Sequence, residues 1–275
     1  MPEGHTLHRL ARDLTEAFAG RRVCSLSPQG RFAAQRIDGR RLGPSRAWGK
    51  HLFVSVEDVP WSVHVHLGLY GSFRIAPGTG HPVAGQVRWR LTASARSGPP
   101  VTADLRGPTI CEILMPPQVA AVLGRLGPDP LRADADPDRA WQRVRRSQRP
   151  VAVLLLDQAV LAGVGNVYRA EVLFRHGIDP MTPGSALDRD TWQAIWDDLV
   201  ALMAVGVERN RIDTVRPEHE PEAMGRPPRV DDHGGEVYVY RRDQMPCWVC
   251  GTQVATRDLA GRRLFWCPAC QNVRG

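Results

Sequence analysis

Four cysteines near the C-terminal end set the narrowest limits on how this 275-residue chain can fold. They follow the pattern Cys247-x2-Cys250-x16-Cys267-x2-Cys270. Two C-x-x-C pairs at such a spacing are typical of a four-thiolate zinc site. Two disulfides would need an oxidising compartment, and nothing in the sequence indicates export. Because four cysteines leave no open coordination position, we predict one structural Zn²⁺ rather than a catalytic metal.

The region from Val23 to Leu114 consists of short runs in which apolar and polar residues alternate. Such runs cover residues 51–56, 61–67 and 87–91, and glycines and prolines separate them. Period-two alternation with this punctuation predicts an antiparallel β-sandwich or barrel. Lys50, the only lysine of this region, directly precedes the first run. Such a lysine either faces a cleft, where it binds phosphate or assists an elimination, or lies solvated at a strand edge.

The segment His66-Leu67-Gly68-Leu69-Tyr70-Gly71 indicates a strand that runs into a glycine-flanked loop. An exposed apolar or aromatic loop tip can insert into a base stack. Leu69 and Tyr70 are therefore candidate wedge residues, although side chains of this kind more often belong to a core.

Beyond Pro116-Pro117 the alternation stops and the pattern becomes helical. Helices are predicted at 118–126, 137–146, 151–161, from the glycine-rich turn 162–166 to about 175, and around 192–203. The glycine-rich turn could present backbone N–H groups to a phosphate. An arginine run over 139–149 is either a phosphate-facing stripe or a solvated face. Residues 216–235 are rich in Pro, Gly and charge, and we expect a mobile loop there.

The first residues, Met1-Pro2-Glu3-Gly4, lead into an amphipathic helix predicted over 3–19. An initiator Met before a small residue is usually removed, which would leave the ring nitrogen of Pro2 as a free secondary amine. Such an amine can form a Schiff-base adduct with an electrophilic carbon, and Glu3 beside it is a candidate acid or base. The alternative is that Pro2 simply opens the helix, since proline is favoured at the first helical position.

The composition is that of a globular protein with an excess of basic residues. Lys and Arg outnumber Asp and Glu by 36 to 29, a formal net charge of +7. A polyanionic partner, above all nucleic acid, fits this balance, but a merely basic protein fits it about as well. No apolar run approaches the roughly 20 residues of a membrane span. We expect a cytoplasmic protein with no membrane partner.

Several motifs occur together and in a fixed order along the chain. They are Met1-Pro2-Glu3-Gly4, Gly49-Lys50, His66-Leu67-Gly68, Leu156-Asp157-Gln158, Gly163-Val164-Gly165-Asn166-Val167-Tyr168-Arg169-Ala170-Glu171 and Cys267-Pro268-Ala269-Cys270-Gln271. Together they closely resemble the formamidopyrimidine-DNA glycosylase/endonuclease VIII family of base-excision repair enzymes. The resemblance spans essentially the whole chain and is most like an actinobacterial endonuclease VIII.

The resemblance implies an α+β multidomain fold. An N-terminal catalytic β-sandwich with flanking helices is expected over 1–115 and a hinge over 116–130. A helix–two-turn–helix DNA-binding domain is expected over 131–240 and a four-Cys zinc finger over 241–275, with DNA in the cleft between the lobes. It also implies a bacterial, nucleoid-associated enzyme that acts as a monomer on double-stranded DNA containing damaged bases or abasic sites.

Residue roles carry over by motif. The resemblance implies that Pro2 attacks the sugar C1′, that Glu3 opens the sugar and relays protons, and that Lys50 assists β-elimination and contacts phosphate. Asn166 and Arg262 would bracket the phosphates at the damaged site, with Arg262 as proton donor for δ-elimination. Arg262 lies five residues before Cys267, as the family pattern requires. Arg263 stands where the family often has a small residue, which leaves the choice between the two arginines open.

Three sequence features indicate which branch of the family the chain resembles. Gly68-Leu69-Tyr70-Gly71 resembles endonuclease VIII, Val151-Ala152 replaces a lysine-containing pair of the purine-repair branch, and Arg125 matches an endonuclease VIII contact to DNA. His5-Thr6 replaces a frequent Pro-Glu and leaves the substrate range open. The expected function is thus a bifunctional glycosylase/AP lyase that removes oxidised pyrimidines and nicks the abasic site by β,δ-elimination. The alternatives are an enzyme mainly for oxidised purines (8-oxoguanine and formamidopyrimidines) and a catalytically inactive damaged-DNA binder.

Overall fold

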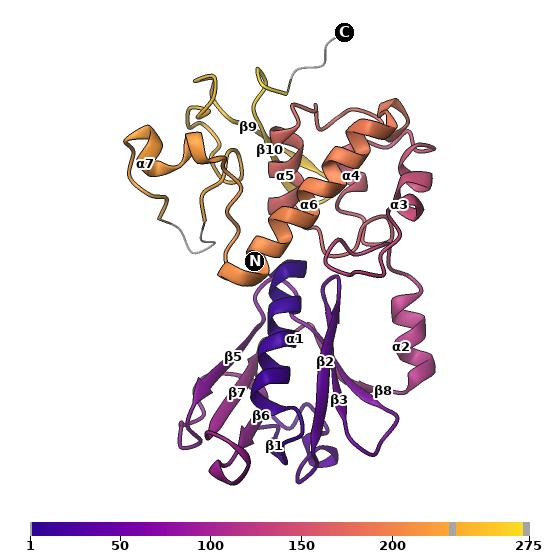
Figure 1. Ribbon diagram of the computed structural model, residues 1–275, viewed down its shortest axis with the longest axis vertical. Coiled ribbons are helices and arrows are strands. Elements are labelled where there is room, and N and C mark those ends of the chain that lie inside the picture. Colours follow the sequence, from indigo (N-terminus) through magenta and orange to yellow (C-terminus); the bar gives the residue numbers. More distant parts are fainter. Residues whose placement is uncertain (1, 231–234, 272–275) are drawn as a thin grey trace. The chain divides into compact units, whose positions relative to one another are not determined.

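The structure is a computed structural model that describes residues 2–230 and 235–271 (Figure 1). It divides into two compact units, residues 1–125 and 126–275. The segment 116–130, expected as a hinge, begins with the helix α2 (Pro116–Leu123), which lies in the first unit. Among the described residues, no helix is both long enough and apolar enough to cross a bilayer.

The first unit is a β-sandwich with one long helix. Its elements are α1 (Gly4–Phe18), β1 (Cys24–Leu26), η1 (Ala34–Arg36), β2 (Leu42–Trp48), β3 (His51–Val56), β4 (Ser62–His66), β5 (Ser72–Pro77), β6 (Val87–Ala93), η2 (Ala95–Ser97), β7 (Val101–Arg106), β8 (Ile110–Leu114) and α2 (Pro116–Leu123). One sheet has the order β1-β6-β7-β5 and the other β2-β3-β4-β8, and all pairs are antiparallel. The predicted sandwich is confirmed.

Both sheets contribute to one apolar core because their strands alternate. Leu52 and Val54 of β3, Val63 and Val65 of β4 and Trp89 of β6 are buried in the same cluster. The helix α1 closes this core with the apolar residues that recur along it at helical spacing, Leu7, Ala11, Leu14 and Phe18. A smaller cluster on the other face of the second sheet, formed by Phe53, Leu114 and Val122, is covered by α2.

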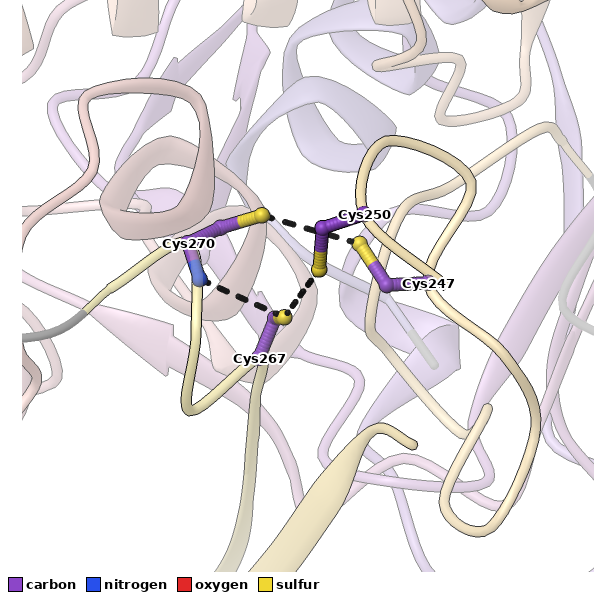
Figure 2. Close-up of side chains that lie close together, drawn as sticks. All are labelled: Cys247, Cys250, Cys267 and Cys270. Atoms are coloured by element: carbon purple, nitrogen blue, oxygen red, sulfur yellow. Dashed lines mark hydrogen bonds between the residues drawn. The ribbon is translucent and has the colours of Figure 1, made fainter. Parts of the chain in front are cut away.

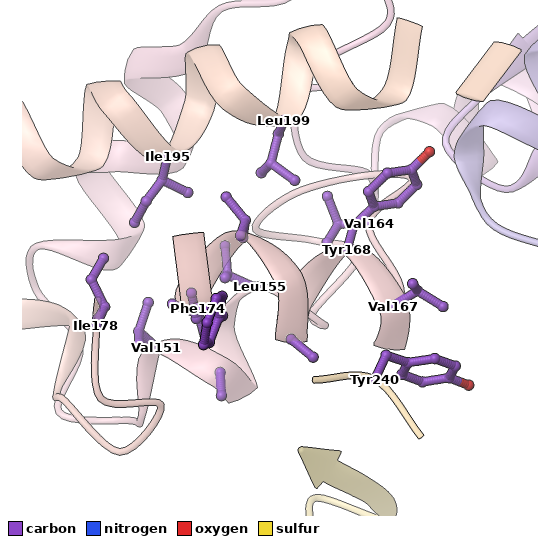
Figure 3. Close-up of a cluster of buried hydrophobic side chains, with 14 of the residues drawn as sticks. Val151, Leu155, Val164, Val167, Tyr168, Phe174, Ile178, Ile195, Leu199 and Tyr240 are labelled. Atoms are coloured by element: carbon purple, nitrogen blue, oxygen red, sulfur yellow. The ribbon is translucent and has the colours of Figure 1, made fainter. Parts of the chain in front are cut away.

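The second unit is mainly helical and ends in a two-stranded hairpin. Its elements are α3 (Pro137–Val144), α4 (Val151–Leu154), α5 (Asn166–Arg175), η3 (Gly184–Ala186), α6 (Arg189–Arg209), η4 (Pro217–His219), α7 (Pro221–Met224), β9 (Ala255–Leu259) and β10 (Arg262–Trp266). Figure 3 shows its core, where side chains of α4, α5 and α6 meet. The same cluster includes Cys247, Leu264 and Cys267, so the cysteine-bearing segment folds onto the helices.

The helix predicted over 151–161 is wrong in length, since α4 ends at Leu154. Two polar side chains end it. The carboxylate of Asp157 accepts from the backbone N–H of Ala159, and the amide of Gln158 binds both the N–H of Gly163 and the carbonyl of Val164. These bonds give the backbone an alternative to helical hydrogen bonding. Two turns result, and α5 begins after them.

The segment 216–230, expected as part of a loop, contains the short elements η4 and α7. The N–H of Arg216 and the ring of His219 both reach the hydroxyl of Tyr238 at 2.9 Å. Residues 231–234, which also belong to the predicted loop, lie outside the described residues.

Candidate functional site

Pro2 lies one residue before the cap of α1. Glu3 is the N-cap and Gly4 the first helical residue, so Pro2 is not at the first helical position and the helix-opening interpretation is wrong in register. Glu3 is fully buried, and its carbonyl accepts from the N–H of Thr6 at 3.0 Å. The helix therefore holds the backbone of Glu3 and leaves the preceding ring nitrogen at its N-terminal end, where the helix dipole favours anionic groups.

We infer from the packing of α1 against β2 that Lys50 reaches about the same level as Pro2. The two elements run antiparallel, because Gly20 contacts Leu42 and the earlier Thr15 contacts the later Ser45. The two elements are fixed to each other at Thr15, whose hydroxyl accepts from the N–H of Ser45 at 2.9 Å. From Thr15 back to Gly4 the helix rises about 16 Å, at about 1.5 Å per residue. From Ser45 to Lys50 the strand and its turn extend about as far, at roughly 3.3 Å per residue.

Lys50 occupies the turn of the β2–β3 hairpin. Trp48 pairs with His51, so Gly49 and Lys50 are the two turn residues. Gly49 has a φ of +54°, which glycine adopts without the steric cost that a side chain brings. Lys50 is thereby presented at the tip of the hairpin, and it is the only lysine in the whole sequence.

The loop after β4 lies at the same end of the first unit, because His66 pairs with His51. Its tip is exposed: Leu69 is 38% and Tyr70 92% accessible to solvent. Two glycines fix its shape. A Cβ on Gly68 would lie 2.0 Å from Oγ1 of Thr109, and one on Gly71 would lie 2.2 Å from a backbone oxygen. Leu69 and Tyr70 are thus not core residues but protrude on a constrained loop.

The second unit places Asn166 beside the β9–β10 hairpin. Asn166 is the first residue of α5 and is largely buried. Its Nδ2 donates to the carbonyl of Arg263 at 2.9 Å, and the guanidinium of Arg169 binds its Oδ1. Asn166 and the hairpin are distant in sequence, so the fold creates this neighbourhood.

The two adjacent arginines of this hairpin differ in their surroundings. The turn consists of Ala260 and Gly261, both with positive φ, and Arg262 follows it as an exposed residue. Arg263 forms an ion pair with Asp243 at 3.0 Å, whereas the side chain of Arg262 has no hydrogen bond or ion pair to any described residue. Arg262 is therefore the arginine whose guanidinium is available to a ligand.

The four cysteines converge at one point of the second unit (Figure 2). Their sulfur atoms lie within 4.8 Å of one another, with 3.4 Å between Cys250 and Cys267 and 3.9 Å between Cys247 and Cys270. A tetrahedral zinc with Zn–S bonds of about 2.3 Å requires sulfurs about 3.8 Å apart. None of the four is in a disulfide. The donor set and its spacing fit a closed four-thiolate metal site.

The metal site is joined to the helical part by Gln271. Its Oε1 accepts from the N–H of Cys267 at 2.9 Å, and its Nε2 donates to the carbonyl of Ile178 at 2.9 Å. A metal bound by these cysteines would hold the β9–β10 hairpin, and with it Arg262, on the second unit.

The comparisons with known proteins agree on one family. The model described as the formamidopyrimidine-DNA glycosylase N-terminal domain matches residues 1–108, and the one described as the formamidopyrimidine-DNA glycosylase H2TH domain matches residues 126–216. Endonuclease 8 1 of Mycobacterium tuberculosis is 52% identical over 277 residues, which cover 98% of this chain and 100% of the relative. The chain belongs to the formamidopyrimidine-DNA glycosylase/endonuclease VIII family. It is a DNA glycosylase/AP lyase of base-excision repair, as the proteins of this family are.

Solved structures of this glycosylase family share the fold. The MutM (Fpg) protein of Thermus thermophilus has a TM-score of 0.73 and 27% identity, and 98% of each chain is covered. The Lactococcus lactis Fpg in complex with DNA containing an abasic site has a TM-score of 0.76 and 19% identity, over 98% of this chain and 99% of that one. At 19% identity the likeness concerns the fold alone.

The structure thus collects the site residues predicted for the glycosylase in two groups. Pro2, Glu3, Lys50 and the loop residues Leu69 and Tyr70 lie at one end of the first unit. Asn166 and the Arg262 hairpin are neighbours in the second. Arg125, the last residue of the first unit, lies near enough to His51 and His64 for its charge to lower the pKa of both, after the larger effect of burial.

Sequence reasoning gave no role to Glu171, although this residue ends the Gly163–Glu171 motif. Glu171 is fully buried and organises the segment 238–240 through its carboxylate. The motif was the signal for this residue, but its partners lie far away in the sequence.

Proposed function

We propose that this glycosylase removes oxidised pyrimidines from double-stranded DNA and nicks the resulting abasic site through a Schiff base at Pro2. The observation that carries the proposal is the Thr15–Ser45 hydrogen bond, which joins α1 to β2. From this bond the lengths of the two elements bring Pro2, Glu3 and Lys50 to about the same level of the first unit. A nucleophilic amine, a buried carboxylate and a single lysine are the groups that such a reaction needs.

The proposed reaction begins once Met1 has been removed. The secondary amine of Pro2 attacks C1′ of the flipped nucleotide and loses its proton, and the damaged base departs with the bonding electron pair. The ring bond between C1′ and O4′ then breaks as O4′ takes up a proton, and the nitrogen lone pair forms the iminium ion. Loss of a proton from C2′ then forms the C2′–C3′ double bond and releases the 3′ phosphate. A second elimination releases the 5′ phosphate, and hydrolysis frees Pro2. Glu3 exchanges protons with the sugar, and Lys50 contacts phosphate and assists the first elimination.

The other predicted residues bind the DNA. Asn166 and Arg262 hold the phosphates beside the lesion, and Arg262 supplies a proton for the second elimination. Its exposed guanidinium, without a protein partner among the described residues, supports this role. Leu69 and Tyr70 fill the space left by the flipped base, as their exposure on a rigid loop suggests. Arg125 adds a further contact with the DNA. The protein acts as a monomer.

The metal proposed for the four cysteines is a structural Zn²⁺. When bound, it neutralises the thiolates and fixes the geometry of the segment that carries them. The chain's own residues then do the rest: the hairpin turn projects Arg262, and Asn166 is oriented by Arg169 and by the carbonyl of Arg263.

Pyrimidine specificity is supported by the 52% identity to a protein named endonuclease 8 and by the Leu69-Tyr70 loop. Oxidised purines are the second candidate, because both matching family models carry the name formamidopyrimidine-DNA glycosylase. Single-turnover excision from matched duplexes with thymine glycol and with 8-oxoguanine separates the two. We expect thymine glycol to be removed at least about tenfold faster, a difference of about 1.4 kcal/mol in barrier. Faster removal of 8-oxoguanine would overturn the assignment.

A further inference from the structure

The outer face of the second sheet in the first unit carries a row of ionisable side chains that the proposed reaction does not use. This is the face opposite the sandwich core, where Phe53 and Leu114 meet α2. Toward the end that bears Lys50, the same face presents His51 on β3, His64 and His66 on β4, and Glu112 on β8. The strand register sets them side by side, because His51 pairs with His66 and His64 with Glu112.

Three of these side chains form a continuous hydrogen-bonded chain. Nδ1 of His51 lies 2.9 Å from Nε2 of His64, and Nδ1 of His64 lies 3.0 Å from Oε1 of Glu112. His64 is only 1% exposed and stacks on Phe53, while the side chain of Glu112 is about half exposed. Apolar residues at these positions would avoid the desolvation of buried imidazoles. Their placement beside Lys50 therefore points to a role in binding or chemistry.

The hydrogen bonds that link His51, His64 and Glu112 fix which ring nitrogens of the two histidines carry hydrogen. An ionised Glu112 only accepts, so Nδ1 of His64 donates to it and the Nε2 of a neutral His64 is left as an acceptor. Nδ1 of His51 must then donate to that Nε2. His51 consequently keeps its own Nε2 free of both bonds of the chain, as the one nitrogen able to take up a proton and donate it to a ligand.

The groups that face His51 are cationic or basic. Lys50 precedes it, Arg125 follows α2, and Arg46 of β2 lies on the same face beside Phe53. The imidazoles of His64 and His66 lie on β4, and burial lowers the pKa of both. Glu112 is the only carboxylate of the row and acts through His64. Burial, together with His64, His66, Arg125 and Lys50, lowers the pKa of His51 to about 3. The DNA-free protein thus holds His51 neutral.

We propose that His51 is a further phosphate-binding group, which becomes protonated when DNA binds and is stabilised in that form by the His64–Glu112 chain. The proposal rests on the proposed function only in taking DNA as the ligand. A phosphate placed among Lys50, Arg125 and His51 offsets the positive charges that oppose protonation. His51 then donates from Nε2 to the phosphate and from Nδ1 to His64, and the negative charge of Glu112 stabilises the imidazolium through His64. DNA binding is therefore coupled to proton uptake.

The test is calorimetric titration of the full-length protein with a short duplex that contains a tetrahydrofuran abasic analogue. This analogue has no C1′ hydroxyl and forms no Schiff base. Titrations at pH 6.0 and 7.5 in buffers of different ionisation enthalpy give the number of protons taken up. The variants are Glu112→Gln, whose amide oxygen still accepts from His64, and His51→Gln. Glu57→Gln, at the other end of β3, is the matched control.

We expect the wild type and Glu57→Gln to take up roughly half a proton more at pH 6.0 than either Glu112→Gln or His51→Gln. The affinities of all four proteins should converge toward pH 7.5. The double variant should behave like either single one, because both act on the same titration. A merely structural role of the chain would weaken binding equally at both pH values. That result, or unchanged proton uptake in both variants, overturns the proposal.

His66 can also titrate, and its contribution is common to all of these proteins and cancels in the comparison. The outcome is independent of the Pro2 chemistry, since the analogue cannot react. Failure of covalent trapping with intact proton-linked binding would count against the proposed reaction alone.

Discussion

Replacing Glu171 by glutamine should destabilise the second unit, because the buried carboxylate is surrounded by hydrogen-bond donors. The carboxylate of Glu171 accepts four hydrogen bonds. Oε2 accepts from the hydroxyl of Thr214 at 2.6 Å and the N–H of Tyr238 at 2.7 Å, and Oε1 from the N–H groups of Val239 at 2.9 Å and Tyr240 at 2.8 Å. In Glu171→Gln an NH₂ group replaces one oxygen and faces two donors. At least one buried backbone N–H then loses its acceptor. The hydroxyl of Thr214 is spared, because it also reaches the carbonyl of Glu236 at 3.3 Å and can itself accept from the NH₂ group.

Each buried donor left without an acceptor costs about 1–3 kcal/mol, so we expect a loss of at least about 1–3 kcal/mol in the free energy of unfolding. Thr214→Val removes one donor and leaves the carboxylate in place, and it should cost about 1 kcal/mol. Glu222→Gln, an exposed site in the same unit, should stay within about 0.5 kcal/mol of wild type.

The measurement is urea unfolding of the three variants, together with hydrogen exchange of the segment 238–240, which reports on this unit even if the two units unfold separately. We expect these amides to exchange faster in Glu171→Gln by the factor that corresponds to the loss in stability. A change below about 1 kcal/mol, with unaltered protection of the segment, would refute the reasoning, because it would mean that the amide satisfies the same donors.

Three further predictions concern the loop, the metal and the pH dependence. Gly68→Ala should lower the rate of single-turnover excision by at least about tenfold with little change in circular dichroism, because its Cβ would meet Thr109 at 2.0 Å. Gly80→Ala is the control and should be neutral, because the space around Gly80 is open. Equal excision rates in the two variants would contradict the role of the loop. Cys250→Ser should reduce bound zinc, measured by a chelating dye, from about one per chain and lower the melting temperature, whereas full zinc retention would contradict four-thiolate ligation. The first unit should lose stability as the pH falls from about 6.5 toward 3, because the unfolded chain binds a proton that folded His51, with a pKa of about 3, does not. Urea unfolding at several pH values should show that stability depends less on pH in His51→Gln than in the wild type. An unchanged pH profile in this variant would contradict the assigned role of His51.

Local patterns predicted the elements whose residues lie close together in sequence. Period-two alternation predicted β3, β4 and β6 because each strand has one buried face, and the cysteine spacing predicted the cluster because each C-x-x-C pair is a local turn. The same reasoning failed for the helix expected over 151–161. An apolar run of that length does not reveal that the side chains of Asp157 and Gln158 turn back onto the backbone.

Features that depend on non-local pairing could not be derived from the sequence. The His51–His64–Glu112 chain exists because β8 pairs with β4, across the three strands that intervene in sequence. Likewise, the spacing to Cys267 favoured Arg262 but could not show how the surroundings of Arg262 and Arg263 differ. The ion pair between Arg263 and Asp243 makes that distinction, and Asp243 lies outside the hairpin.

The most direct test of the proposed reaction is to locate the covalent bond that it requires. The protein with Pro2 as its first residue is incubated with a thymine-glycol duplex and sodium borohydride, and the adduct is digested and mapped by mass spectrometry. We predict that the DNA fragment is attached to the nitrogen of Pro2, and that one extra residue before Pro2 abolishes the adduct because it converts the amine to an amide. Since Lys50 is the only lysine of the chain, an adduct formed by a lysine amine instead of Pro2 would map to this one residue. An adduct on Lys50, or one that survives the N-terminal extension, would contradict the proposal.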